Sequence, residues 1–372
     1  MLSPVDETSA NSPDLRPSGP VPHRRRPRYG GKYPRRYQDK YKELDPTRFP
    51  DIHRKVLDSG KTPAGTHRPI MVQEILSVLA PQPGDAAVDC TLGYGGHAEA
   101  LLRCLSPSGR LIGLEQDPLE LTRTEARLRK AGYGPDVFVA RRTNFAGLAK
   151  TLGDLQLPAV DIVLADLGVS SMQLDNPIRG FSFKHEGPLD MRMNPVKGKP
   201  ASAILESIAP AKLIQLFHEA ADEPFAELLG NALAGHSFPT TIELASSIKE
   251  LLSRRSAEEV DPSIRRVFQA LRIAVNDEFS ALDALLRQVP SCLRRGGRVA
   301  ILSFHSGEDR RVKTAFATGF REGVYSQVSS EVIRPALEER RANPRAQSAK
   351  LRWAQKAKDP SSGDGTHLHS AV

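Results

Sequence analysis

The sequence contains only three cysteines and no long apolar run, and each of these two features excludes a class of protein. Cys90, Cys104 and Cys292 have no C-x-x-C spacing, so we expect reduced thiols packed as small apolar side chains, with no disulfide framework and no metal site. No apolar stretch approaches the roughly 18 to 20 residues of a membrane span. The N-terminus has no signal-peptide core, and Asp6 and Glu7 argue against a mitochondrial presequence. We therefore expect a cytoplasmic protein that makes no contact with a membrane.

The excess of basic side chains lies mainly in the N-terminal segment 1–66, where 14 Lys and Arg stand against 8 Asp and Glu. This segment is rich in proline and poor in aliphatic residues, which is typical of a disordered extension without a core. Between Arg24 and Lys42 it interleaves basic residues with four tyrosines, a mixture suited to phosphates and unpaired bases. The open alternative is a solvated tail with no partner. We also expect the Gly- and Ser-rich residues 356–372 to be a disordered tail.

From residue 67 onward, short apolar runs alternate with amphipathic segments. This alternation predicts an α/β fold with a doubly wound, mostly parallel sheet, in which ligands bind at the carboxyl ends of the strands. The expected strands are 86–90, 109–115, 137–141, 160–165 and 296–304. The expected helices beside them are 71–79, 98–105, 118–130 and 305–320, with another that opens at Asn144-Phe145. Residues 201–290 have helical periodicity without a clear strand, which indicates a helical insertion inside the sheet domain.

Polar or glycine-rich segments follow several of the expected strands. Asp89 to His97 contains three glycines and leads directly into a helix, an arrangement that leaves backbone N–H groups free for a ligand. Glu115 ends the second strand, where a carboxylate holds the ribose hydroxyls of a nucleotide. Phe145 and Asp166 also lie at strand ends. Together these positions favour a cofactor that contains a nucleoside.

The segment from Asp166 to Asn194 is nearly thirty residues long and has neither helical nor alternating periodicity. Loops of this length in compact domains are usually functional or disordered. Its ten aliphatic, aromatic and methionine residues make it too apolar to stay solvated, so we interpret it as an ordered active-site loop.

These segments together resemble the RsmH (formerly MraW) family of bacterial 16S ribosomal RNA cytosine-N4 methyltransferases, which use S-adenosylmethionine. The resemblance covers about residues 67–353 and leaves the segment 1–66 outside it. Its motifs are His67 to Ile70, Asp89 to His97, Asp166 to Asn194, Phe268 to Ile273 with Val275-Asn276, Phe304 to Arg310, and Asn343 to Arg345 with Leu351-Arg352. Tyr94 and Glu115 depart from the family's usual Arg and Asp, the latter with its carboxylate preserved.

The resemblance implies a class I methyltransferase, Rossmann-like, with an inserted helical domain that helps to grip RNA. The domains expected from it are the sheet domain at 67–176 and 267–355 and the insertion at 177–266. By resemblance, the residues that bind S-adenosylmethionine are Gly95, Gly96, His97, Glu115, Phe145, Asp166 and Gln173.

The chemistry expected of such an enzyme is methyl transfer to a poorly nucleophilic amine, which needs alignment and a proton acceptor. Our first candidate for the group that accepts the proton or orients the amine is Asp166, with Ser170 or Ser171 and the nearby backbone carbonyls as alternatives. Asp190 and His305 are candidates for orienting the base or for a structural network. Arg179 and Arg192 are expected to hold phosphates of the RNA, and Phe181 or Phe183 to stack on the base or, as the alternative, to anchor the loop in a core.

Three other interpretations stay open at this point. A nicotinamide dehydrogenase also uses a glycine turn and a ribose acid, but the sequence has no clean G-x-G-x-x-G after the first strand. A noncatalytic ribosome-assembly factor explains the basic tail, and a methyltransferase of the same fold acting on another nucleic acid explains the cofactor positions. The expected partner is 16S rRNA or the small ribosomal subunit, and the sequence leaves a homodimer open.

Overall fold

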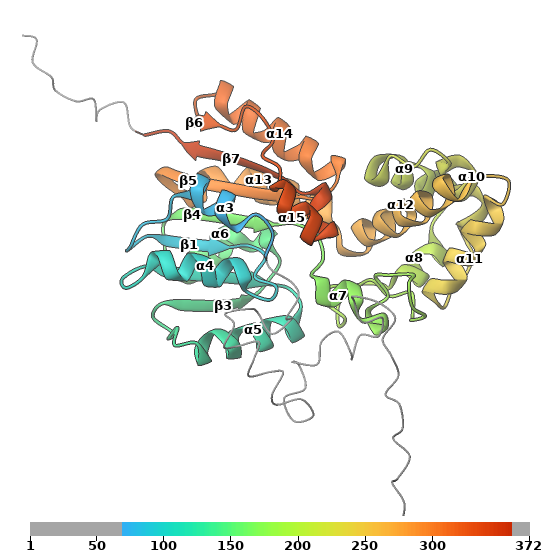
Figure 1. Cartoon of the computed structure of the whole chain (residues 1–372), viewed down its shortest axis with the longest axis horizontal. Helices are drawn as coiled ribbons and strands as arrows, with labels where there is room; N and C mark the ends of the chain where they lie inside the picture. The colour runs from blue at the N-terminus through green and yellow to red at the C-terminus, as the bar shows by residue number, and fades with distance from the viewer. Residues whose placement is uncertain (1–68, 359–372) are drawn as a thin grey trace, which may run out of the picture. The chain divides into compact units, whose positions relative to one another are not determined.

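The computed structural model describes residues 69–358, which form a seven-stranded sheet with the strand order β3-β2-β1-β4-β5-β7-β6 (Figure 1). β7 runs antiparallel to both of its neighbours, and the pairs from β3 to β5 are parallel. The predicted doubly wound, mostly parallel sheet is therefore confirmed. The strands are β1 (Ala86–Asp89), β2 (Arg110–Glu115), β3 (Phe138–Arg142), β4 (Val160–Asp166), β5 (Leu293–Ser303), β6 (Tyr325–Val328) and β7 (Lys350–Lys356).

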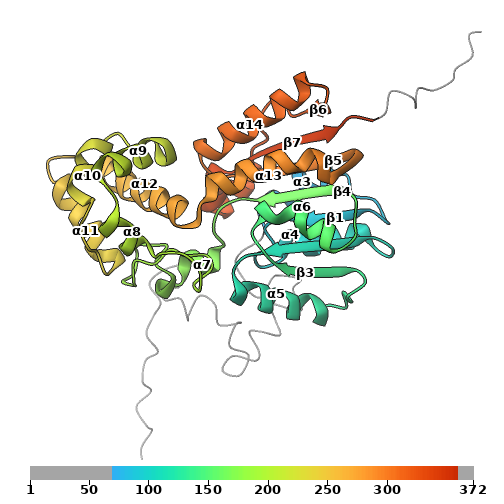
Figure 2. The same cartoon turned by 180° about the vertical axis from the view of Figure 1, so that it is seen from behind.

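Helices cover both faces of this sheet, as Figures 1 and 2 show from opposite sides. One face packs against α3 (Val72–Leu79), α4 (Gly96–Leu105) and α5 (Pro118–Lys130), and the other packs against α6 (Leu148–Asp154), α13 (Glu278–Cys292) and α14 (Ser306–Arg321). β1 is buried at all four positions because its side chains meet a helical layer on each face. Cys90 and Cys292 lie in the apolar core between the sheet and the helices α6, α13 and α14. All three cysteines are free, as predicted.

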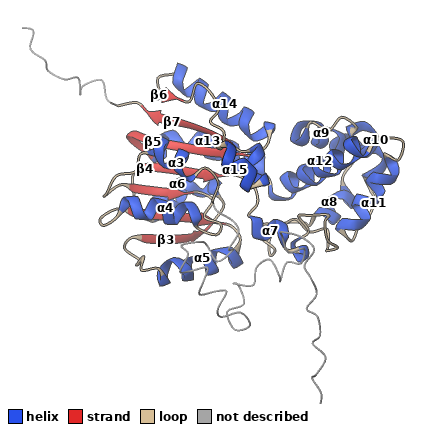
Figure 3. Cartoon of the chain, viewed as in Figure 1, coloured by secondary structure: helices blue, strands red, loops and turns tan. Residues whose placement is uncertain are grey.

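A separate apolar core lies outside the sheet and is built from helices (Figure 3). It contains α8 (Ala201–Ser207), α9 (Pro210–Ala221), α10 (Ala226–Leu233), α11 (Thr241–Leu251) and α12 (Ala257–Asn276). α11 has a capped N-terminus, because the Thr240 hydroxyl accepts a hydrogen bond from the N–H of Glu243.

The end of the insertion differs from the sequence-based boundary at residue 266. α12 is continuous from Ala257 to Asn276, and its buried side chains belong to the helical core as far as Ile273. A boundary inside one helix would divide that core. We therefore propose that the insertion ends at Asn276, just before α13 returns to the sheet.

Several elements were not predicted from the sequence. The loop after β4 contains the short helix α7 (Ser171–Asp175) and the 3₁₀ turn η3 (Pro177–Arg179). The 3₁₀ turn η4 (Pro344–Ser348), which follows α15 (Leu337–Ala342), was not predicted either. The helix expected to open at Asn144-Phe145 is present, because the 3₁₀ turn η2 (Phe145–Gly147) leads into α6. The basic segment Lys350–Lys356 forms β7, the strand that pairs with β5. The expected extension at 1–66 and most of the expected C-terminal tail lie outside the described residues.

Candidate active site

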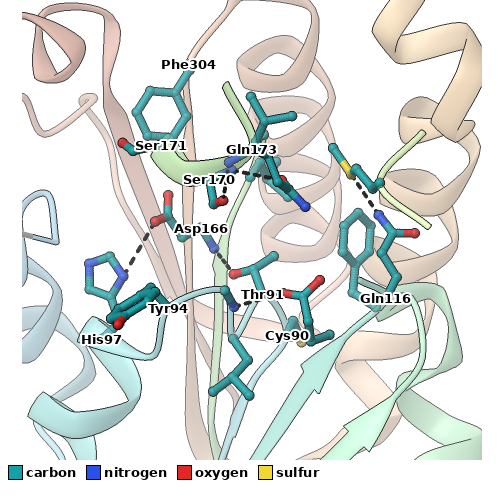
Figure 4. Close-up of a pocket in the computed structure, with 18 of the residues that line it drawn as sticks. Cys90, Thr91, Tyr94, His97, Gln116, Asp166, Ser170, Ser171, Gln173 and Phe304 are labelled. Atoms are coloured by element: carbon teal, nitrogen blue, oxygen red, sulfur yellow. Dashed lines mark hydrogen bonds and ion pairs between the residues drawn. The ribbon is translucent and has the colours of Figure 1, made fainter. Parts of the chain in front are cut away.

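A cavity of about 400 Å³ lies at the carboxyl ends of the strands, the position predicted for a ligand in a doubly wound sheet. Its walls come from the turn after β1, the ends of β2 and β4, the loop that contains α7, and the segment after β5 (Figure 4). All of the residues predicted to bind the cofactor line this one cavity: Gly95, Gly96, His97, Glu115, Phe145, Asp166 and Gln173.

The backbone of the glycine turn reaches the cavity because Gly95 and Gly96 have no side chains that would cover it. Gly95 adopts the left-handed conformation, with φ of 77°, as the residue before α4. A Cβ on Gly96 would lie 2.8 Å from the ring of Pro69. The guanidinium of Arg127 on α5 donates to the carbonyls of Tyr94 at 2.8 Å and Gly95 at 3.1 Å. Pro69 and Arg127 of α5 therefore fix the shape of the turn.

Glu115 ends β2 with both carboxylate oxygens bound to backbone. Oε2 accepts from the N–H of Gly93 at 2.8 Å, and Oε1 accepts from the N–H of Asp117 at 2.8 Å. Burial raises the pKa of Glu115 to about 7. The acid thus ties the glycine turn to the segment after β2.

Asp166 ends β4, and its carboxylate lies beside the His97 ring in the wall of the cavity (Figure 4). Its Oδ2 lies 3.5 Å from Nδ1 of His97, and its buried Oδ1 has no hydrogen-bond partner among the described residues. Burial raises the pKa of Asp166 to about 7, and the nearby charge of Glu308 acts in the same direction. The carboxyl group is therefore poised to change protonation near neutral pH.

The tautomer of His97 follows from its other contact. Nε2 lies 2.9 Å from the carbonyl oxygen of Ile70, which only accepts, so Nε2 carries the hydrogen. Burial lowers the pKa of His97, so the ring is neutral near pH 7 and Nδ1 has a lone pair. His97 thus offers Asp166 an acceptor for a proton.

The loop after β4 places two serines beside Asp166. Ser170 caps α7: its hydroxyl accepts from the N–H of Gln173, and the Gln173 side chain accepts from the N–H of Ser170. Ser171 is the first residue of α7, and Figure 4 shows it next to Phe304. Both serines line the cavity.

Comparison with known proteins identifies the family. The sequence model of the MraW methylase family matches residues 64–357. The chain belongs to the MraW methylase family. Curated relatives named ribosomal RNA small subunit methyltransferase H 1 or H 2 come from Alkaliphilus metalliredigens, at 47% identity, and Lachnoclostridium phytofermentans, at 45% identity. Each match covers 90% of this chain, and 97% and 93% of the respective relative.

These matches correct one expectation about the N-terminal extension. Residues 67–372 make up about four fifths of the chain, so a match that covers 90% of it includes part of the segment 1–66. A relative from Carboxydothermus hydrogenoformans, at 38% identity, covers only 78% of this chain. Some members of the MraW family therefore share part of the extension, which our motifs had left outside the resemblance.

The structure does not bring every predicted site residue to the cavity of this MraW family member. Asp190, Arg192, Arg179, Phe181, Phe183 and His305 are absent from its walls. Phe181 is 6% exposed within the helical core, and the Phe183 ring packs edge to face against Phe268 with centroids 5.2 Å apart. The geometry favours the alternative in which both phenylalanines anchor the loop, because Phe181 is buried and Phe183 packs against the helical core.

The predicted phosphate contact of Arg179 needs correction. Arg179 is 9% exposed, and its guanidinium is bound to Asp117 and to backbone carbonyls within the protein. Arg192 pairs with Asp190 through Nε and Nη2, at 2.8 and 2.7 Å. Burial raises the pKa of Asp190, but the bonds from Arg192 outweigh it and leave the pKa below its usual value. The Asp190 carboxylate is therefore bound by Arg192 within the same loop.

His305 has a structural place at the start of α14. Its Nδ1 accepts from the N–H of Glu308, and its ring lies 5.8 Å from that of Phe279 between centroids. Glu308, three residues later, is the acid that reaches the cavity. Its carboxylate also accepts a hydrogen bond from the N–H of Phe304. Burial raises the pKa of Glu308, but His305 and Arg272 outweigh it and the pKa is lowered.

Several cavity residues were not predicted, although they lie in segments that carried the resemblance. They are Arg272, Asn276, Phe304, Glu308, Asn343 and Arg345. The sequence shows that these residues belong to the motifs, but it does not show that they lie beside the cofactor residues. Phe304 and Glu308 are brought there by β5, and Arg345 is held there by its contact with Asp175, at 2.6 Å.

Two absences concern residues 69–358 only. Within that range, no group of three or more His, Cys, Asp or Glu side chains is arranged to hold a metal ion. No helix in that part of the chain has the length and apolar character to cross a membrane.

Proposed function

We propose that this chain transfers a methyl group from S-adenosylmethionine to the exocyclic N4 of a cytidine in 16S ribosomal RNA, in the cytoplasm. The observation that carries the proposal is the meeting of the glycine turn, Glu115 and Asp166 in one cavity at the strand ends. The curated relatives, which are named as methyltransferases of small-subunit ribosomal RNA, support the choice of substrate.

The cavity residues fit the proposed cofactor. We assign the backbone at Gly95 and Gly96 to its methionine end, Glu115 to its ribose hydroxyls and Phe145 to its adenine. When bound, S-adenosylmethionine supplies a sulfonium methyl group, which the N4 lone pair takes as the methyl–sulfur bond breaks. The unpartnered Oδ1 of Asp166 is an acceptor without a donor in the described chain, which fits a site completed by ligands.

The amine needs help because its lone pair is delocalised into the cytosine ring. As N4 forms its new bond to carbon it gains positive charge and must lose a proton. We assign Asp166 as the acceptor of that proton. Its pKa of about 7 lies near the working pH, where an acceptor combines a large ionised fraction with useful basicity. The neutral His97 stabilises the protonated product because its Nδ1 accepts from the Asp166 hydroxyl.

The wall formed by α7 and Phe304 is our candidate for the base site. Ser171 and Phe304 lie side by side above Asp166 in Figure 4, and both line the cavity. A cytidine flipped from its strand would stack on the Phe304 ring, with its amine directed toward Asp166. Phe304 thus takes the stacking role for which the sequence had suggested Phe181 or Phe183.

Nucleoside mass spectrometry of ribosomal RNA tests the proposal. A strain that lacks this chain is expected to lose N4-methylcytidine from its 16S rRNA and to regain it with the wild-type chain but not with Asp166→Ala. Unchanged N4-methylcytidine in the deletion strain would contradict the substrate. Wild-type methylation by the Asp166→Ala chain would contradict the assigned acceptor. Calorimetric binding of S-adenosylmethionine but not of NAD separates the proposal from a dehydrogenase.

A further inference from the structure

A buried carboxylate outside the cavity holds the active-site loop at several points. Asp117 follows β2 and is fully buried. Its Oδ1 accepts from the N–H of Leu119, which caps α5. Its Oδ2 accepts from two side chains of the loop, Nε2 of Gln173 at 2.9 Å and Nη1 of Arg179 at 2.7 Å.

Arg179 extends this connection to the end of the loop. Its second nitrogen, Nη2, donates to the carbonyls of Arg192 and Met193, each at 2.9 Å. The planar guanidinium can bind a carboxylate on one side and two carbonyls on another, which an ammonium group cannot do with the same geometry. Three sequence-distant points of the loop, near residues 173, 179 and 193, are therefore joined to one carboxylate.

Neither member of this ion pair touches the cavity, but their partners do. Gln173 and Met193 line the wall of the cavity, whereas Asp117 and Arg179 do not. Met193 is held further by Gln116, whose Nε2 lies 2.8 Å from its sulfur. The ion pair thus sets the distance between the loop wall and the end of β2.

The cofactor half of the cavity has separate support. Glu115 is bound by the backbone N–H groups of Gly93 and Asp117, which do not depend on the side chain of Asp117. The glycine turn is held by Arg127. Loss of the Asp117–Arg179 pair would leave these contacts in place while releasing the wall that carries Ser170, Ser171 and Gln173. Of the residues that the resemblance assigns to the cofactor, only Gln173 lies on this wall.

We propose that Asp117 and Arg179 are positioning residues that fix the wall of α7 and Met193 over the cofactor, so that their loss lowers turnover more than cofactor affinity. The inference rests on the proposed methyl transfer for its turnover measurement. It goes beyond the predicted role of Arg179 as a phosphate contact, because the guanidinium acts on the reaction only through the loop.

The test compares three full-length variants with the wild type. Arg179→Lys keeps the charge and removes the planar fork. Asp117→Asn with Arg179→Gln removes both charges together, so that neither is left buried and unpaired. Arg294→Lys is the matched control, since Arg294 pairs with Asp161 at 2.7 Å at the other end of β4 and β5, away from the cavity.

Three measurements distinguish positioning from general damage. Calorimetry gives the Kd for S-adenosylhomocysteine, unmethylated small ribosomal subunits give kcat and KM, and hydrogen exchange reports on residues 170–194. We expect kcat to fall about 10-fold in Arg179→Lys and about 100-fold in the double variant, the range for a misplaced reacting group. Faster exchange should be confined to residues 170–194, and the Kd should stay within about threefold, which is under 1 kcal/mol.

Two results would overturn the inference. One is wild-type kcat and loop exchange in both variants. The other is an equal loss of kcat and cofactor affinity with faster exchange throughout the sheet, which would show general destabilisation. If the wild type transfers no methyl group to the RNA, the proposed function fails, while cofactor affinity and loop exchange still decide the role of the ion pair.

Discussion

At the scale of single residues, the protonation of Asp166 is the feature that a pH profile exposes. Its pKa of about 7 means that the carboxyl is mostly protonated at pH 6 and mostly ionised at pH 8. Because a proton acceptor must be ionised, kcat should rise with pH through about 7 and then level off. Single-turnover methylation of unmethylated small ribosomal subunits between pH 5.5 and 9 measures this.

The matched variant is Asp166→Asn, which keeps the shape of the side chain. We expect its rate to be about 10²- to 10⁴-fold lower, the usual contribution of a positioned acid or base, with no inflection near pH 7. Glu115 also has a pKa of about 7, but its titration should appear in the Kd for the cofactor. An inflection of kcat that persists in Asp166→Asn would rule Asp166 out as the acceptor.

Glu120 is a buried acid that weakens the fold at high pH. It is 3% exposed, its Oε2 has no partner among the described residues, and burial, with the charge of Asp117, raises its pKa to about 7. A raised pKa means that the protonated acid is favoured in the fold, so stability is present below the unfolded value near 4.5 and is lost as the pH rises through 7.

We therefore expect Glu120→Gln to raise the free energy of unfolding by about 1 to 3 kcal/mol at pH 8 and by much less at pH 5. Urea denaturation at the two pH values measures the difference. Glu125→Gln on the same helix is the control: its side chain is 41% exposed beside Arg129, so its effect should stay within about 0.5 kcal/mol. A gain of equal size at both pH values would show that ionisation of Glu120 is not the cause.

At the scale of elements, α5 controls the glycine turn through Arg127. Its guanidinium is 13% exposed, pairs with Glu99 at 2.7 Å and donates to two carbonyls of the turn. Arg127→Lys keeps the charge beside Glu99 and loses the fork to the carbonyls. We expect the Kd for S-adenosylhomocysteine to rise about fivefold, or about 1 kcal/mol, with a smaller change in kcat.

Calorimetry with Arg103→Lys provides the comparison, because Arg103 pairs with the same Glu99 from a position that is 64% exposed. Its Kd should match the wild type, since exposed pairs contribute little. If Arg127→Lys binds the cofactor as tightly as the wild type, the turn does not depend on α5. Arg127→Lys should change the Kd for the cofactor more than kcat, whereas Arg179→Lys should change kcat more than the Kd. The two variants therefore distinguish the cofactor half of the cavity from the loop wall.

Elements whose character is set locally were predictable from the sequence. β1, β4 and β5 are apolar runs because helices cover both faces of the sheet, and the ligand residues follow them directly. β7 was missed because Lys350, Arg352 and Lys356 give it a basic sequence. Arg352 is only 8% exposed, and its charge is met by Asp309 at 2.7 Å. That partner is distant in sequence, so the strand did not look buried.

The same reason explains which site residues could not be placed from the sequence. Glu115 and Asp166 are placed by the strand that each one ends, so their position follows from the sequence alone. Arg179 and Phe183 lie in an irregular loop, where position depends on tertiary partners. The partner of Arg179 is Asp117, at the end of β2, and the partner of Phe183 is Phe268, on α12. Both partners are far away along the chain, so no local pattern distinguishes a buried loop arginine from one that binds phosphate.

At the scale of the whole molecule, the charge of the chain and the chemistry of the site lie in different segments. The formal net charge is +8, and most of it comes from the segment 1–66, which precedes the residues that line the cavity. Part of this extension is matched by relatives at 45 to 47% identity, and the match to the 38% relative covers less of the chain. The extension is therefore suited to act on RNA affinity independently of the cofactor.

Deleting residues 1–60 tests this separation. Basic side chains bind RNA by displacing its counterions, so the truncated chain should bind RNA more weakly at low salt and with a smaller salt dependence. The slope of log K against log salt should fall by about 0.7 for each phosphate of single-stranded RNA that the truncated chain no longer neutralises. The Kd for S-adenosylhomocysteine should not change, because the described cavity contains no residue from this segment.

A second variant separates charge from stacking within the extension. Replacing Tyr29, Tyr33, Tyr37 and Tyr41 by Leu keeps every basic residue and removes the aromatic faces. If the tyrosines stack on unpaired bases, affinity should fall by about 1 to 3 kcal/mol per stacked base with no change in the salt slope. Filter binding of 16S rRNA across a salt series measures both quantities. If the truncated chain keeps the wild-type affinity and slope, the extension makes no contact with RNA, and the charge that binds the substrate must lie on the sheet domain or the insertion.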